Sequence, residues 1–143
     1  MSILKKENII LNSNVSEKTE AIKLAGQILV DQGYVSADYI PAMLQREALS
    51  STYMGNFLAI PHGTDEAKAA VLQSGLSVVQ VPNGVDFGDG NIVKLLVGIA
   101  GKDGEHLEIL SQIAIVCSEE ENVEKLVQAK SEEEIISILS EVN

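Results

Sequence analysis

The stretch IVKLLVGI at Ile92–Ile99 decides the fold class, because it is almost wholly apolar. A strand with one solvated face alternates apolar and polar residues, whereas a continuous apolar run is typical of a strand covered on both faces. The β-branched run Leu76–Val81 predicts a second strand, and short apolar runs predict two more at Ile9–Leu11 and Phe57–Ile60. Asn83-Gly84 predicts a turn. We therefore expect an α/β domain, with a mixed sheet between layers of helices on both faces.

Segments with helical spacing alternate with these strands. The first helix is expected to follow Ser16 as its N-cap and to end at Gly33. The second is expected to start near Asp38, because Pro41 is tolerated only close to a first turn. Further segments are predicted to be helical or mixed at Glu66–Leu72, and helical at Glu105–Cys117, Asn122–Ala129 and after the capping box Ser131–Glu134.

Length, composition and charge exclude several classes of protein. The chain has 143 residues, 45% hydrophobic and 22% charged, so residues 1–143 are expected to form a single domain. Ten Lys and Arg against 21 Asp and Glu give a net charge of −11, the wrong sign for a nucleic-acid binder. No apolar run approaches the ~18 residues of a membrane span, and no signal peptide is recognisable. Together with a single cysteine, this predicts a cytoplasmic protein without membrane insertion.

His62 stands in the tripeptide Pro61-His62-Gly63, directly after the strand predicted at Phe57–Ile60. Open α/β sheets present ligands beyond the ends of their strands. Pro61 stiffens the backbone there, and Gly63 allows another molecule to approach closely. An ordinary turn histidine fits the tripeptide as well as a site histidine does.

His106 and Arg46 are the other candidates. His106 lies near the start of the helix predicted at Glu105–Cys117, where the dipole favours an anion and a neutral imidazole ring. It is in register with Leu110 on an apolar stripe that begins at Leu107, so it is expected to face the core. Arg46 is the single arginine of the chain. Its guanidinium would suit an oxyanion, although a cation at the end of a helix explains it too.

Other chemistries lack their motifs. Neither H-x-x-x-H nor C-x-x-C spacing occurs, so zinc is not supported, and we expect neither a metal nor a cofactor. The G-x-S-x-G elbow of hydrolases and the G-x-x-x-x-G-K-[ST] phosphate loop are also absent from the sequence. Cys117 falls on the apolar stripe of its helix, which predicts a packing role.

The segment REALSSTYMGNFLAIPHGTDEAK at Arg46–Lys68 resembles the active-site segment of the enzyme IIA components of the bacterial phosphoenolpyruvate-dependent sugar phosphotransferase system. Within that family it is similar to the mannitol type, close to the fructose and nitrogen-related types. The stretches Q-x-P-x-G-V-x-F at Gln80–Phe87 and H-L-x-x-L at His106–Leu110 extend the resemblance over nearly the whole chain. It implies about five strands in a mixed sheet. Many family chains are fused to IIB and IIC, but hydrophobic spans and a IIB-like cysteine segment are absent from this sequence, so we expect a standalone IIA protein.

The resemblance also implies a phosphocarrier. His62 would accept a phosphoryl group on Nε2 from the phosphocarrier protein HPr and pass it to a cysteine of the IIB component for uptake and phosphorylation of mannitol. Arg46 matches the family's active-site arginine and His106 its second active-site histidine. A neutral imidazole is a good nucleophile toward phosphorus, and hydrogen-bond donors from both residues would stabilise the transferring oxygens.

Further expectations concern the surroundings of His62. Thr64 would add a hydrogen bond or orient the ring, and Met54 and Phe57 on the rim would contact partners, although loop packing explains these two equally well. The acidic surface would attract a basic patch on HPr. We expect a monomer.

Two alternative functions fit the same sequence. One is a regulatory, nitrogen-type IIA-like phosphoprotein, against which the stretch Gln80–Phe87 argues and which growth on mannitol after deletion would test. The other is a small metal- or histidine-dependent hydrolase. Metal analysis and turnover of generic phosphoesters would test the second.

Overall fold

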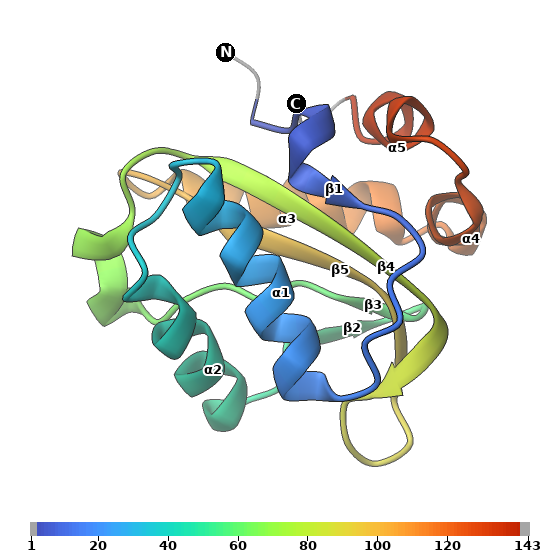
Figure 1. Cartoon of the computed structure of the whole chain (residues 1–143), viewed down its shortest axis with the longest axis horizontal. Helices are drawn as coiled ribbons and strands as arrows, with labels where there is room; N and C mark the ends of the chain where they lie inside the picture. The colour runs from blue at the N-terminus through green and yellow to red at the C-terminus, as the bar shows by residue number, and fades with distance from the viewer. Residues whose placement is uncertain (1–2, 141–143) are drawn as a thin grey trace.

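The computed structural model describes residues 3–140 as one five-stranded sheet between helices (Figure 1). The strands are β1 (Ile9–Ile10), β2 (Tyr53–Gly55), β3 (Leu58–Ala59), β4 (Gly75–Asp86) and β5 (Ile92–Ala100). Their order is β1-β4-β5-β3-β2. The β1–β4 and β3–β5 pairs are parallel and the β4–β5 and β2–β3 pairs antiparallel. The mixed sheet predicted from the sequence is confirmed.

Helices cover both faces of the sheet, as predicted (Figure 1). The α-helices are α1 (Lys18–Asp31), α2 (Tyr39–Leu49), α3 (Glu105–Cys117), α4 (Glu120–Gln128) and α5 (Glu132–Ile138). Two 3₁₀ segments, Lys6–Asn8 and Asp65–Ala70, accompany them, the second in place of the helical or mixed stretch expected there. Within residues 3–140, no helix combines the length and the apolar character needed to cross a membrane.

The central strand β5 is buried along most of its length because its side chains alternate between two cores. Leu95 and Val97 pack with α3, α4 and α5, whereas Leu96 packs with α1 and α2. This alternation is the physical reason for the continuous apolar run in the sequence.

The two ends of α1 show which local sequence signals set the limits of the helix. Ser16 is not the N-cap, because Glu17 occupies that position and α1 begins at Lys18. Gly33 ends the helix as predicted, with a φ of 80°. Its N–H donates to the carbonyl of Val30, and the next N–H donates to Leu29, the paired arrangement typical of a glycine-terminated helix.

One local prediction in the sheet is wrong, and one strand was not predicted. The turn expected at Asn83-Gly84 does not form, because β4 continues to Asp86 through a change of register between Gln80 and Val85, where Gly84 has a φ of 83°. Such a bulge bends a strand without ending it. The short strand β2 was not expected, and it pairs with β3 across a tight turn at Asn56-Phe57.

Candidate active site

His62 lies where the chain leaves β3 and continues beside the carboxyl end of β5. The backbone forms an isolated parallel bridge between His62 and Ile99, and the Ile99 N–H donates to the carbonyl of Pro61 at 2.9 Å. The end of a strand therefore places this histidine, as the sequence predicts.

The orientation of the half-buried His62 ring is fixed by one hydrogen bond. Nδ1 lies 2.8 Å from the carbonyl oxygen of Ile60. Since a carbonyl can only accept, Nδ1 carries the proton in the neutral ring and Nε2 has a free lone pair.

The electrostatic surroundings favour the neutral form of this ring. Burial is the largest influence and lowers the pKa of His62 from its ordinary 6.5, against the opposing effect of the bond to Ile60. Electrostatic interactions with Arg46 and His106 lower the pKa of His62 further, and the carboxylate of Asp65 raises it. Because the net pKa lies below 6.5, the ring is predominantly neutral at pH 7.

His62, Arg46 and His106 line one open hollow of about 760 Å³. The structure thus brings together three predicted residues from the segment after β3, the last turn of α2 and the first turn of α3. The other residues of its wall are Leu49, Met54, Ile60, Gly63, Thr64, Asp65, Glu66, Leu107, Leu110, Ser111 and Ala114.

Arg46 makes the contact expected of a cation at the end of a helix, and its role toward an oxyanion stays a prediction. Its Nη1 donates to the carbonyl of Ser50 at 2.7 Å, at the C-terminal end of α2, while the residue also lines the hollow. The neighbouring Glu47 is buried and accepts hydrogen bonds from the N–H and hydroxyl of Thr52 at 2.9 and 2.6 Å. It also pairs with Lys18 at 3.1 Å. These contacts hold the loop that follows Arg46 against the body of the protein.

His106 is the second residue of α3, after Gly104 with a φ of 84°. A side chain at residue 101 would collide with the backbone of His106, so glycine is required for this close approach. The expectation that His106 faces the core is wrong. The buried side of α3 includes Ile109, whereas His106 is half-buried at the hollow and Leu107 is 66% exposed.

Met54 and Thr64 line the hollow as expected. Met54 is 46% exposed on the rim. Thr64 is the N-cap residue of the 3₁₀ segment Asp65–Ala70, but its side chain makes no capping hydrogen bond. It lines the same pocket as His62, and a hydrogen bond from its hydroxyl toward the ring stays a prediction.

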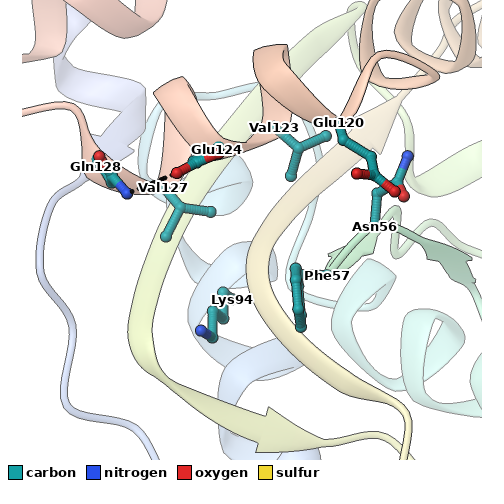
Figure 2. Close-up of a pocket in the computed structure, with 8 residues that line it drawn as sticks. All are labelled: Asn56, Phe57, Lys94, Glu120, Val123, Glu124, Val127 and Gln128. Atoms are coloured by element: carbon teal, nitrogen blue, oxygen red, sulfur yellow. Dashed lines mark hydrogen bonds between the residues drawn. The ribbon is translucent and has the colours of Figure 1, made fainter.

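Phe57 does not line this hollow, so its predicted place on the His62 rim is wrong. It lies in a second groove, between the β2–β3 turn and α4, opposite Val123 and Val127 (Figure 2). The ammonium of Lys94 stands 4.8 Å from the centre of the Phe57 ring. Carboxylates of Glu120 and Glu124 also line this groove (Figure 2).

Comparison with known proteins adds to this geometry. Residues 2–142 match the family described as phosphoenolpyruvate-dependent sugar phosphotransferase system, EIIA 2. The chain belongs to this family. The resemblance seen in the segment Arg46–Lys68 is therefore confirmed at the level of the family.

Relatives and solved structures of this EIIA 2 chain match it over its length. Proteins named mannitol-specific phosphotransferase enzyme IIA component from Geobacillus stearothermophilus and Bacillus subtilis (strain 168) are 70% and 64% identical over 100% of this chain, and 99% and 100% of theirs. A structure described as a complex of enzyme IIAMTL and phosphorylated enzyme IIBMTL from Escherichia coli superimposes with a TM-score of 0.91. It is 39% identical and covers 96% of this chain and 97% of that chain.

No motif in the sequence indicates a role for Tyr39, the first residue of α2. Its buried hydroxyl accepts a hydrogen bond from Gly63 N–H at 2.9 Å and donates one to the carbonyl of Ile99 at 2.8 Å. The sequence indicates only that Tyr39 stands near a helix start. Its hydrogen-bond partners Gly63 and Ile99 lie 24 and 60 residues further along the chain, so no local pattern connects them with it.

The remaining candidate groups agree with structural roles. Cys117 is buried, and burial raises the pKa of its thiol to about 11, which removes the thiolate at neutral pH. Across residues 3–140, His, Cys, Asp and Glu side chains nowhere gather in threes that could hold a metal ion.

Proposed function

We propose that this EIIA 2 protein is the phosphocarrier of a mannitol uptake system. His62 accepts a phosphoryl group on Nε2 from phosphorylated HPr and passes it to a cysteine of the mannitol-type IIB component. The observation that carries the proposal is the hydrogen bond from His62 Nδ1 to Ile60, which leaves Nε2 unprotonated in a hollow shared with Arg46 and His106.

The acceptance step is a transfer of one group. The Nε2 lone pair of His62 attacks phosphorus, and the bond between phosphorus and the donor atom breaks, with its electron pair retained by the donor. Because Nδ1 keeps its proton, the ring gains positive charge as the N–P bond forms, and the carbonyl of Ile60 stabilises that charge. The ring becomes neutral again when the phosphoryl group departs, so His62 is a good leaving group toward IIB.

Charge on the transferring oxygens requires groups that are already in place. The guanidinium of Arg46 has five N–H donors, and its bond to Ser50 uses only part of them. The ring of His106 adds a further donor, and its place at the start of α3 adds the positive end of a helix dipole. Thr64 contributes its hydroxyl from the same wall.

Partner recognition combines apolar and charged surface. Leu49, Met54 and Leu107 on the rim are 73%, 46% and 66% exposed, and they provide apolar contact around His62. The net charge of −11 steers a basic patch on HPr toward the protein. The IIB partner is supported by the similarity to the E. coli complex with phosphorylated IIB.

The choice of mannitol rests on the relatives. The stretch Gln80–Phe87, which distinguishes the mannitol type, begins with a buried residue whose Nε2 donates to the carbonyls of Leu126 and Ala129 at 2.8 and 2.9 Å. Gln80 therefore fixes the end of α4 and does not itself recognise a sugar or partner. The names of the relatives at 70% and 64% identity support mannitol over a nitrogen-type regulator.

Reconstitution tests the proposal. The protein is incubated with phosphoenolpyruvate, enzyme I and HPr, the label is mapped by phosphopeptide analysis, and mannitol-type IIB is then added. We expect one labelled residue, His62, and loss of its label to IIB. Deletion should abolish growth on mannitol, whereas unchanged growth or label that stays on the protein would favour a regulatory role.

A further inference from the structure

We propose that Tyr39 is a positioning residue for the phosphoryl chemistry. Its hydroxyl fixes the His62 segment on β5, and through α2 it sets the position of Arg46 relative to His62. The kinetic part of this inference rests on the proposed function, whereas the effect on the His62 ring can be measured without any phosphoryl transfer.

The hydroxyl of Tyr39 reinforces the backbone ladder on which His62 lies. One bond of the parallel bridge runs from Ile99 N–H to the carbonyl of Pro61 at 2.9 Å. The next bond of a parallel ladder joins Gly63 N–H to the carbonyl of Ile99. The Tyr39 hydroxyl serves both of these groups, at 2.9 and 2.8 Å. Both residues that flank His62 are therefore attached to Ile99, and the second attachment uses Tyr39.

The position of the Tyr39 side chain is restricted by its packing. The residue is only 5% exposed, and a Cβ on Gly63 would lie 2.6 Å from Cε1 of its ring. Glycine at 63 is thus the residue that lets the ring approach the loop. Burial raises the pKa of Tyr39 above 10.0, so the hydroxyl keeps its proton and remains a donor at neutral pH.

The same side chain also fixes α2. Tyr39 is the first residue of this helix and Arg46 lies seven residues later. Seven residues are about two turns, or roughly 10 Å along the axis, so both side chains lie on one face of the helix. The contact of Tyr39 with Gly63 and Ile99 thereby fixes the start of the helix that carries the cation of the hollow.

Tyr34 provides a matched control in the same molecule. It is 3% exposed, its hydroxyl accepts a hydrogen bond from Asn8 Nδ2 at 2.9 Å, and its ring packs on Gly75 at the start of β4. Tyr34→Phe removes a buried hydroxyl from a ring that packs on a glycine, as Tyr39→Phe does. Tyr34 and its neighbours Asn8 and Gly75 do not line the hollow that contains His62 and Arg46.

The experiment compares Tyr39→Phe and Tyr34→Phe with the natural protein in three measurements. ¹⁵N NMR of the unphosphorylated protein reports which nitrogen of His62 carries the proton. Rapid-quench kinetics report phosphoryl transfer from phosphorylated HPr, and thermal denaturation reports stability. In Tyr39→Phe we expect part of the ring population to move its proton to Nε2 and the transfer rate to fall about tenfold, since small displacements of reacting groups slow transfer steeply. Tyr34→Phe should retain the natural ring signal and rate, even where its melting temperature falls equally.

Two further variants separate positioning from packing. Arg46→Lys should slow transfer by a smaller factor in the Tyr39→Phe background than in the natural protein, because the helix start is no longer fixed. Gly63→Ala, which forces the ring of Tyr39 away, should reproduce the changed His62 ring signal and serves if Tyr39→Phe fails to fold.

The outcomes are distinct. Natural ring signals and rate in Tyr39→Phe, or equal rate losses in both tyrosine variants that follow their melting temperatures, would overturn the inference. A natural ring signal in Gly63→Ala would do the same. If the natural protein accepts no phosphoryl group from HPr, the proposed function fails, and the ring signals alone still decide the role of Tyr39.

Discussion

Two hollows lie along β5, one at each end, and they differ in volume, about 760 and 370 Å³, and in the side chains that line them. At the carboxyl end, His62 shares its hollow with Arg46 and His106. Near the amino end, Phe57 and Lys94 face carboxylates of α4 (Figure 2). Each hollow is lined by one permanent cation and two carboxylates, which are Asp65 and Glu66 in the first and Glu120 and Glu124 in the second. Net charge therefore does not distinguish them, and the difference lies in the two histidines of the first hollow.

The two hollows also differ in the chemistry of their aromatic rings, which are those of His62 and Phe57. The proton of His62 is held on Nδ1 by a backbone carbonyl, so the free lone pair of the ring is on Nε2. Phe57 has no lone pair, and an ammonium already stands against its ring. The comparison shows that the hollows are distinguished by a ring nitrogen with a fixed proton, which neither the size of a hollow nor its net charge indicates.

The largest expected difference between the hollows comes from removing the nucleophile. His62→Ala should abolish label from phosphorylated HPr and leave the fold intact, because the Nε2 lone pair of His62 is the nucleophile of the proposed step. Phe57→Ala is the matched control in the second groove and should accept label normally. Gel or mass-spectrometric detection of the phosphoprotein measures the label on each of the two variants. Label on His62→Ala at the natural rate, with none on His106→Ala, would reverse the two roles.

The cation of the first hollow should have the next largest effect. Arg46→Lys keeps the charge but loses the planar fork, so phosphoryl transfer should slow by about tenfold or more with little change in melting temperature. Lys94→Gln, which removes the cation of the second groove, should transfer at the natural rate. A kinetically silent Arg46→Lys, or one that only lowers the melting temperature, would contradict a role in transfer.

His106 should matter more for the second transfer than for the first. His106→Gln retains a donor, so acceptance from HPr should slow only about threefold. Onward transfer to IIB should slow by about tenfold, because an amide cannot become charged beside the departing group. Single-turnover rates of the two half-reactions measure the ratio, and equal slowing of both would show that the ring acts only as a neutral donor.

A smaller effect is expected where partners touch the rim. Met54→Ala should raise the KM for HPr about fivefold, since about 1 kcal/mol of apolar contact would be lost. Phe57→Ala should leave that KM unchanged, because Phe57 lies in the other groove. Steady-state kinetics with varied HPr distinguish the two variants, and the reverse result would place the HPr surface over the β2–β3 turn and α4.

The smallest effect concerns pH. A ring with a pKa of 6.5 would be about three-quarters neutral at pH 7, and the lowered pKa of His62 increases that fraction. NMR titration of the ring should therefore give a midpoint below 6.5, and acceptance should be almost constant from pH 7 to 8 and fall on acidification. Arg46→Gln should move the midpoint upward, since the guanidinium lowers it. A midpoint above 6.5 in the natural protein would contradict the burial of the ring.

Local signals in the sequence identified most elements but not all of their ends. Gly33 ends α1 because a left-handed conformation is needed there, and Pro41 restricts where α2 can begin. Ser131 caps α5 through the N–H of Glu134, as the capping box predicts. The bulge in β4 was interpreted as a turn because Asn83-Gly84 is chemically suited to both.

The sequence by itself determined the family and the two-sided burial of β5, and it predicted His62 as the nucleophile, because each depends on residues that are neighbours along the chain. Only the tertiary structure decided the proton on Nδ1 of His62, the separation of Phe57 from the hollow, and the contact of Tyr39 with Gly63 and Ile99. Periodicity describes which side of an element is apolar, but it carries no information on which atoms of distant elements meet. Those contacts depend on how the helices and strands pack, and they fix which nitrogen of His62 carries the lone pair and which charges surround it.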